Sequence, residues 1–439
     1  MDDIRPSGDL NRILMRRLDG DGPLGVAVSG GGDSVALLYR LAEWGRRPLH
    51  VFCVDHGLNP ASPAWTRDVA VHARRTGAAF TALRWAGPKP ATGLSAAARL
   101  ARHRLLADAA RAAGIRVLCL AHTQDDIREA AWMRAQGSNV TAPAEWSPSP
   151  VWPQGRGIFL LRPLLGEGRD SLRDDLTARK IAWIDDPANA NPASLRARAR
   201  SAGKTDIVPS EPTAIAPESF EALLDRQWAG LGLIALRHDV LAGLSLPMAR
   251  KIVAAAVVCA GGGDRLPRGD SVEALLAEPV LARPRTLCGA RIWSSAGRLL
   301  VVREAGDIGR QGHGDLQLAP GAEAVWDGRY ALRAAAAAGR VAASSGVRSR
   351  LSEADAAALR RLPAAVRGIL PVFDADFPDP VLSTPRLLGQ TMETGVDCVD
   401  WVLPRLAAAC GLVDRESRIG FGLARPEQAC MAKPQTLPI

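Results

Sequence analysis

Short apolar runs alternate with helical patterns through the first 130 residues of the chain. Apolar runs typical of strands cover residues 25–28, 49–54, 80–85 and 117–121. Between them, apolar residues recur at helical spacing over residues 35–44, 67–76 and 95–113. This alternation predicts a Rossmann-like α/β fold, in which a parallel sheet carries helices on both faces. Ligands of such folds collect at the carboxyl ends of the strands.

The pattern loosens after this part of the chain. Residues 137–157 are rich in Pro, Ser and Gly and predict a loop. A helix is expected over 169–180, followed by an extended segment over 181–184. Small polar residues with Pro and Gly over 201–217 predict the main domain boundary.

Beyond that boundary, residues 217–260 and 352–362 have helical patterns, and residues 279–302 have a β-like pattern. No internal repeat is visible. We therefore expect three domains, which are an α/β domain over 1–205, a mainly helical domain over 206–305 and a small C-terminal α+β domain over 306–439.

The charge of the chain is unevenly distributed. The 439 residues are 47% hydrophobic and 23% charged, which excludes a collagen-like or wholly disordered chain. Residues 1–205 hold 29 basic and 20 acidic side chains, whereas residues 206–439 hold 26 of each, so the first part accounts for the whole net charge of +9. Such an excess suits a polyanion-binding surface, and solvated surface charge is the alternative.

Cysteine content and the amino terminus indicate the compartment. Seven cysteines without a C-x-x-C pair fit neither a disulfide framework nor a thiolate metal site. The start of the chain is acidic where a signal peptide would be basic, and no apolar run approaches the roughly 18 residues that span a bilayer. We expect a cytoplasmic protein without a membrane partner, and a homodimer remains open.

The strongest local signal is Ser29-Gly30-Gly31-Gly32-Asp33-Ser34, between the first predicted strand and the first helix. Consecutive glycines let backbone N–H groups approach an anion, and a helix amino terminus adds partial positive charge. The segment therefore predicts a phosphate-binding loop. A Walker loop is excluded because no lysine follows, whereas a dinucleotide fingerprint lacks only its last glycine, at Val35, and has an acidic partner in Asp55. A glycine turn without function is the remaining alternative.

The same segment resembles the S-G-G-x-D-S signature of the PP-loop ATP pyrophosphatases in every fixed position. The motifs that follow it are Val54-Asp55-His56-Gly57-Leu58, Ala98-Arg99-Leu100-Ala101-Arg102-His103, Ala121-His122-Thr123-Gln124-Asp125-Asp126, Arg162-Pro163-Leu164-Leu165 and Asp186-Pro187-Ala188-Asn189. In this order they resemble the tRNA(Ile)-lysidine synthetase family over about residues 20–200. Beyond residue 200 the resemblance is weaker.

The resemblance implies a fold and a reaction. The fold would be a PP-loop domain, a helical connection and a small C-terminal domain. In the reaction, ATP adenylates the C2 oxygen of the wobble cytidine in the CAU anticodon of tRNA(Ile) and pyrophosphate leaves. The amine of free L-lysine then displaces AMP and gives lysidine. ATP and Mg²⁺ would be bound, and the partners would be tRNA(Ile) and lysine.

Each need of that reaction has candidate residues. The nucleotide is expected at Ser29, Gly30, Gly31, Gly32, Asp33, Ser34, Val54, Asp55 and His56, with Asp33 and Asp126 as Mg²⁺ ligands. The catalytic candidates are Asp33, Arg99, Arg102, Asp125 and Asp126. Lysine and tRNA are expected at His122, Asp125, Asp126, Glu129, Arg162, Asp186, Asn189, Arg196, Arg198 and Arg200.

Spacing supports two of these groups. Arg99 and Arg102 share one helix face, which suits a phosphate-rich transition state or else a solvated basic surface. Asp125, Asp126 and Glu129 gather where a strand meets a helix. Carboxylates there would hold Mg²⁺ or the ammonium of lysine, and a helix cap is the alternative for Asp125.

Arg196, Arg198 and Arg200 form the most basic short run. In an extended segment they would line one side and match a phosphate ladder, whereas in a helix they would spread around the surface. Thr123 and Ile127 depart from the His-His-x-x-Asp-Gln pattern of the family. The alternative functions are therefore another PP-loop tRNA modifier, such as a thiolase, and a non-catalytic nucleotide- or RNA-binding PP-loop protein.

Overall fold

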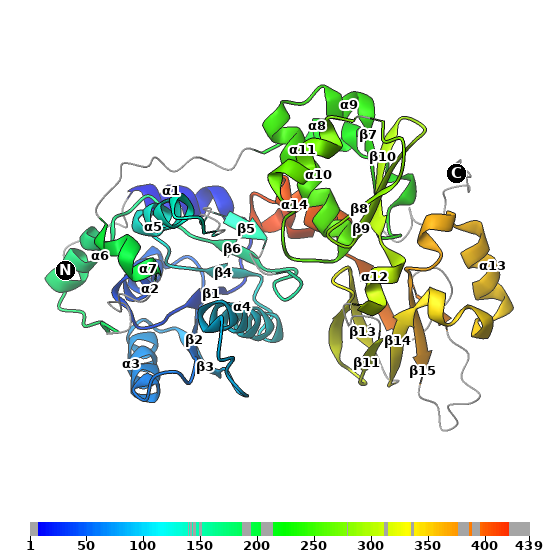
Figure 1. The fold of residues 1–439 in the computed structure, drawn as a ribbon. Coiled ribbons are helices and arrows are strands. Elements are labelled where there is room, and N and C mark those ends of the chain that lie inside the picture. Colours follow the sequence, from blue (N-terminus) through cyan, green and yellow to red (C-terminus); the bar gives the residue numbers. More distant parts are fainter. Residues whose placement is uncertain are drawn as a thin grey trace. The chain divides into compact units, whose positions relative to one another are not determined.

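The computed structural model of the protein describes residues 8–138, 140, 143, 146–148, 152–186, 195–202, 214–278, 280–310, 315–334, 338–375, 386–388 and 396–420 (Figure 1). The chain forms two compact units. The first comprises Met1–Pro212 and Val413–Ile419, and the second comprises Thr213–Leu412 and Gly420–Ile439. The chain therefore returns to its first unit near its end.

The first unit is built on a six-stranded sheet. Its strands are β1 (Leu24–Ala27), β2 (Leu49–Asp55), β3 (Ala79–Arg84), β4 (Val117–Cys119), β5 (Trp146–Pro148) and β6 (Phe159–Leu161). They lie in the order β3-β2-β1-β4-β6-β5, and every neighbouring pair is parallel except β5 with β6. The predicted parallel sheet is confirmed, whereas β5 lies in a stretch that its Pro and Ser content predicts as a loop.

Helices cover both faces of this sheet. They are α1 (Gly8–Arg17), α2 (Gly32–Trp44), α3 (Ser62–Arg75), α4 (Leu94–Ala112), α5 (Gln124–Ala135), α6 (Arg169–Ala178) and α7 (Leu195–Ser201). On one face Leu106 of α4 joins Phe52 of β2 and Leu118 of β4 in a buried core. The side chain after Phe52, Cys53, points to the opposite face, and α3 packs against β2. The expected α/β architecture is therefore confirmed.

The order in which strands are added to the sheet changes at β1, because β2 and β3 lie on one side of it and β4 and β6 on the other. Leu24 of β1 pairs with Leu49 of β2 on one side and with Val117 of β4 on the other. The loops that follow β1 and β4 therefore lead to opposite faces of the sheet. In open α/β sheets, ligands bind in the crevice between two such loops. Ser29–Ser34 follows β1 and His122–Asp126 follows β4, so the fold brings both motifs to one edge of the sheet.

The described part of the second unit holds three further sheets, with strand orders β7-β10-β9-β8, β11-β14-β15-β16 and β12-β13-β17. The strands are β7 (Leu233–Arg237), β8 (Arg285–Leu287), β9 (Ala290–Ser295), β10 (Arg298–Arg303), β11 (Asp315–Leu318), β12 (Glu323–Trp326), β13 (Tyr330–Ala334), β14 (Gly339–Ala343), β15 (Pro371–Ala375), β16 (Arg386–Leu387) and β17 (Val396–Asp400). The helices are α8 (Pro217–Leu223), α9 (His238–Ala242), α10 (Leu246–Gly261), α11 (Gly269–Leu276), α12 (Ala305–Arg310), α13 (Glu353–Arg361) and α14 (Val402–Ala409). The predicted β-like stretch and the predicted helix at 352–362 are both present.

Two predicted segments differ from the structure. The helical prediction over 217–260 overlooks β7, because Leu233–Leu236 is buried throughout and a continuous apolar run does not distinguish a strand from a buried helix. Residues 181–184 form no strand. The domain division at 305/306 stays a prediction, and one core contains residues from both sides of it, such as Leu300 and Leu332. No helix in the described ranges is long and apolar enough to cross a membrane.

Candidate active site

The phosphate loop between β1 and α2 is held in shape by its own groups. Ser34 donates its hydroxyl to the carbonyl of Gly31 (2.8 Å) and accepts the backbone N–H of Ser29 (3.2 Å). Gly30 has a φ of +90°, which favours glycine, and a Cβ at this position would lie 2.3 Å from Cδ1 of Ile184. The backbone N–H of Ile184 donates to the carbonyl of Gly30 (2.9 Å). The conformation of the loop is thus fixed by its own hydrogen bonds and by the segment that contains Ile184.

Asp33 lies in the first turn of α2, directly after the glycines. Its Oδ2 accepts a hydrogen bond from Nε of Arg169 (3.1 Å), whereas its Oδ1 is buried without a hydrogen-bond partner among the described residues. Burial raises the pKa of this carboxyl, although the nearby guanidinium of Arg169 opposes the shift. A buried oxygen without a partner is costly, so Oδ1 is a candidate ligand for a cation.

Three carboxylates gather at the start of α5. Asp126 accepts the backbone N–H of Thr123 on its Oδ2 (2.9 Å) and completes a capping box. Asp125 instead accepts the backbone N–H of Arg169, at the start of α6 (2.7 Å). Glu129 follows one turn later and is 4% exposed. Thr123 is therefore the N-cap of α5 with Asp126 as its capping-box partner, and Asp125 joins α5 to α6.

Three arginines pair with two of these carboxylates, Glu129 and Asp126. Oε1 of Glu129 accepts from NH1 of Arg169 (3.0 Å) and from Nε of Arg200 (2.9 Å). Nε of Arg196 donates to the other oxygen of Glu129 (2.8 Å), and NH2 of Arg196 donates to Oδ1 of Asp126 (2.5 Å). The structure therefore brings the predicted acidic cluster together with two of the predicted arginines.

The arginine run lies on a helix, α7. Arg196 and Arg200 are four residues apart, so they share the face that meets α5, while Arg198 points elsewhere and is exposed. Because Arg196 and Arg200 are engaged with carboxylates, the three side chains do not form a ladder along one side. Arg198 remains available to a phosphate.

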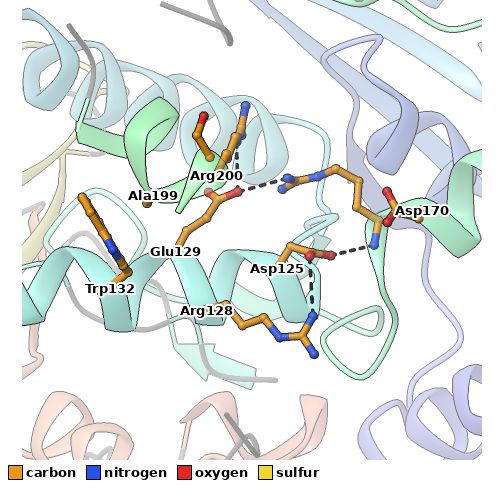
Figure 2. A pocket seen from close by; sticks show the side chains of 9 residues that line it. Asp125, Arg128, Glu129, Trp132, Asp170, Ala199 and Arg200 are labelled. Atoms are coloured by element: carbon orange, nitrogen blue, oxygen red, sulfur yellow. Dashed lines mark hydrogen bonds and ion pairs between the residues drawn. The ribbon is translucent and has the colours of Figure 1, made fainter. Parts of the chain in front are cut away.

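A polar cavity of about 320 Å³ lies beside these ion pairs (Figure 2). Its lining consists of Asp125, Arg128, Glu129, Trp132, Arg169, Asp170, Ala199, Arg200 and Ser201. Figure 2 shows Glu129 pointing from α5 toward Arg200, and Asp125 next to Arg128, with 3.7 Å between Oδ1 and NH1. Because the lining carries carboxylates and guanidiniums together, it is complementary to a small zwitterion such as a free amino acid.

A second group consists of Arg99, Arg102 and Arg162 with two histidines. Nε of Arg162 donates to Nδ1 of His122 (3.2 Å). Burial and the neighbouring guanidiniums lower the pKa of Arg102 and that of Arg162 to about 10. The same causes lower the pKa of His103 to about 2 and the pKa of His122 well below its usual value. Crowded guanidiniums favour an anion among them, and both histidines are neutral near pH 7.

The end of β2 supplies the third predicted group. Oδ1 of Asp55 accepts the backbone N–H of Gly57 (2.7 Å). This carboxylate therefore stabilises a local turn, whereas the acidic residue of a dinucleotide site binds the ribose. The ring of His56 meets Trp85 edge-on, with 6.2 Å between ring centroids, and its Nδ1 is buried without a partner in the described structure. Val54 is half-buried. His56 is therefore a better candidate than Asp55 for contact with a nucleoside.

One important residue was not predicted from the sequence. Arg169 contacts both the phosphate loop and α5. Its position in the first turn of α6, where a positive charge is unfavourable beside the helix dipole, is the feature of the sequence that could have indicated a special role. Among the predicted residues, Asp186 is half-buried at the end of a described segment, and Asn189 lies outside the described residues.

Comparison with known proteins identifies the family. The pattern of the PP-loop domain family matches residues 9–204. A tRNA(Ile)-lysidine synthase of Caulobacter vibrioides is 44% identical over 415 residues, which cover 92% of this chain and 97% of that relative. The chain belongs to the tRNA(Ile)-lysidine synthase family. The tRNA(Ile)-lysidine synthase of Brucella ovis is 34% identical over 337 residues, covering 70% of this chain and 72% of the relative.

Among solved structures, a U34-tRNA thiolase of Methanococcus maripaludis aligns with 44% of this chain and 70% of its own, at 15% identity and a TM-score of 0.38. This similarity is too distant to bear on the activity of a lysidine synthase.

Two departures from the lysidine synthase pattern have structural roles here. Thr123, which stands at the second histidine position, is fully buried, and both its backbone N–H and its hydroxyl donate to Asp126. Ile127, which stands at the amide position, is 6% exposed and packs in the interior. Both residues therefore support α5, and the acidic cluster of this family member is assembled without the usual side chains.

Proposed function

We propose that the protein uses ATP to ligate free L-lysine to C2 of the wobble cytidine in the CAU anticodon of tRNA(Ile). ATP first adenylates the C2 oxygen and releases pyrophosphate. The lysine amine then attacks C2, and AMP leaves with that oxygen, so that lysidine is formed. The observation that carries this proposal is the 44% identity over 97% of a tRNA(Ile)-lysidine synthase.

The nucleotide is proposed to bind at the loop Ser29–Ser34 and at the end of β2, residues 54–56. The backbone N–H groups of the loop and the start of α2 would hold the pyrophosphate. Asp33 and Asp126 are the proposed Mg²⁺ ligands, and the bare Oδ1 of Asp33 supports this assignment. Mg²⁺ in nucleotide sites is typically bound by one or two carboxylates together with phosphate oxygens. When bound, Mg²⁺ would supply charge neutralisation at the phosphates.

Lysine is proposed to occupy the cavity beside α5. Its carboxylate would pair with Arg128 or Arg200, and its ammonium groups would pair with Asp125 or Glu129, because these side chains line the same cavity. The carboxylates would hold the chain of lysine so that one amine reaches the cytidine.

The arginine group is proposed to bind the phosphates of the reaction. Arg99, Arg102 and Arg162 crowd together, and an adenylate phosphate among them would relieve their mutual repulsion. Nδ1 of His122 accepts from Arg162, so the neutral ring carries its proton on Nε2 and is a hydrogen-bond donor there. Arg198 is the proposed contact to the tRNA backbone, while Asp186 and Asn189 stay candidates for the substrate. The cytoplasmic location, the absence of a membrane partner and the homodimer also stay predictions.

The cysteines of the first unit argue against the thiolase alternative. Sulfur transfer needs reactive thiolates. Burial raises the pKa of Cys53 to about 11 and that of Cys119 to about 12, so both are protonated at neutral pH.

One assay tests the proposal. The protein is incubated with ATP, Mg²⁺, labelled lysine and an unmodified CAU-anticodon tRNA, and the tRNA is then analysed for label. We expect ATP-dependent incorporation of lysine into this tRNA. We expect none into a methionine tRNA, which has the same CAU anticodon. Folded protein that binds ATP but incorporates nothing would indicate the non-catalytic alternative, and lysine-independent sulfur incorporation would indicate a thiolase.

A further inference from the structure

Arg169 joins the two halves of the site. Its Nε contacts Oδ2 of Asp33 at 3.1 Å and its NH1 contacts Oε1 of Glu129 at 3.0 Å, while NH2 lies 3.9 Å from Oδ1 of Asp126. A single guanidinium thus lies among carboxylates from the phosphate loop and from α5. These carboxylates raise the pKa of Arg169, although burial opposes this, so the guanidinium stays charged.

The carboxylates differ in their dependence on Arg169. Glu129 also binds Arg196 and Arg200, and Asp126 also binds Arg196. For Asp33, Arg169 is the ion-pair partner in the described structure. Loss of Arg169 from the α5 carboxylates would therefore leave them compensated in part and open to another cation.

The backbone of Arg169 is fixed, and its largely buried side chain borders the cavity. The N–H of Arg169 donates to Asp125 at 2.7 Å, and the side chain is 17% exposed at the edge of the cavity. The guanidinium is therefore free to change partners without movement of α6. Triphosphate oxygens bound at the loop that contains Asp33 would be stronger partners for it than a carboxylate that already has two other arginines.

We propose that Arg169 sets the order of substrate binding. Before nucleotide binds, its guanidinium occupies the place of the lysine ammonium beside Glu129. When ATP fills the loop, the guanidinium turns to the phosphates and the carboxylates become available to the amine. Lysine therefore binds well only after ATP. This inference rests on the proposed function, because it takes lysine as the occupant of the cavity.

The test measures lysine binding by equilibrium dialysis with labelled lysine, with and without a non-hydrolysable ATP analogue and Mg²⁺. For the wild type, we expect the analogue to tighten lysine binding on the order of tenfold, since coupling between sites is typically 5–150-fold. For Arg169→Gln, lysine binds without nucleotide as tightly as it binds the wild type with nucleotide, and the analogue has no further effect. A damaged fold would weaken binding in both states, so this gain separates the proposed role from a structural one.

Arg179→Gln is the matched control, because Arg179 follows the last residue of α6, away from the phosphate loop, and pairs with Asp175 (3.7 Å). It should keep the tenfold coupling, and Arg169→Lys, which restores a charge, should recover part of it. Coupling that persists in Arg169→Gln, or lysine binding to the wild type that ignores the analogue, would overturn the inference and leave the proposed function standing. A wild type that binds no lysine in either state would contradict both.

Discussion

At the scale of residues, the site keeps its charges in two environments. The carboxylates of α5 are each matched by guanidiniums, whereas Arg99, Arg102 and Arg162 crowd one another, so that burial and repulsion depress the pKa of the latter two. The first arrangement suits a cationic ligand that exchanges with a resident guanidinium. The second suits an anionic ligand, whose charge would offset the repulsion among the guanidiniums.

Asp33→Ala tests the loop assignment. Because Asp33 contributes the unpaired oxygen beside the glycines, its removal should lower pyrophosphate release by at least about a hundredfold, as is usual when one preorganised charged group is lost. The melting temperature should stay close to that of the wild type, because the substitution also removes a buried oxygen that has no hydrogen-bond partner in the described structure. Asp174→Ala, an exposed acid on α6, is the control. Release at the wild-type rate from Asp33→Ala would refute the assignment.

His103 should make the stability of the first unit dependent on pH. Its pKa falls from 6.5 to about 2, mainly through burial, so below pH 6.5 the unfolded chain binds a proton that the folded chain does not. The free energy of unfolding therefore falls as the pH falls, by about 1.4 kcal/mol for each pH unit below 6.5. His103→Gln should show a slope shallower by that amount in urea unfolding between pH 6.5 and 5. Equal slopes in the two proteins would contradict the buried neutral histidine.

At the scale of elements, the sequence predicts what periodicity and glycines control. The strands β1 to β4, α4 and the loop at Ser29–Ser34 are found where the pattern places them, whereas the parallel strand β6 was not predicted. Periodicity does not distinguish β7 from a buried helix, because Leu233–Leu236 is apolar throughout. The role of Arg169 was also beyond prediction, because its contacts with Asp33 and Glu129 join residues far apart in the chain and depend on how α6 meets the sheet.

The helical form of α7 separates its arginines by role. Arg198 is exposed, so Arg198→Gln should weaken tRNA binding and reduce the slope of log affinity against log salt by about 1. Arg200 is paired with Glu129, so Arg200→Gln should leave the salt slope unchanged and alter lysine binding instead. Filter binding of tRNA at several salt concentrations measures both slopes. The opposite pattern, a reduced slope for Arg200→Gln alone, would exclude Arg198 as the phosphate contact.

At the scale of the whole molecule, the end of the described chain completes the first unit. Both guanidinium NH groups of Arg47 donate to Glu416, at 2.6 and 2.9 Å, and the backbone N–H of Gly20 also donates to that carboxylate (3.1 Å). Ser417 donates its backbone N–H to Asp19 (2.8 Å). These contacts lie before β1 and β2, at the edge of the sheet opposite the phosphate loop. Residues 413–419 therefore contribute to the stability of the ATP-binding unit without touching its site.

This contribution is measurable because the Arg47–Glu416 pair is buried, with side chains 4% and 9% exposed. Glu416→Ala leaves a buried guanidinium unpaired and should lower the free energy of unfolding of the first unit by about 3–5 kcal/mol. Arg12→Ala removes an exposed pair with Asp9 and should cost less than about 1 kcal/mol. If the lower stability of Glu416→Ala comes from the unpaired charge of Arg47, the double variant Arg47→Met with Glu416→Leu should recover most of the lost free energy of unfolding. Two apolar side chains leave no buried charge. Denaturant unfolding measures all three variants, and a double variant as unstable as Glu416→Ala would show that the loss comes from packing of the segment instead.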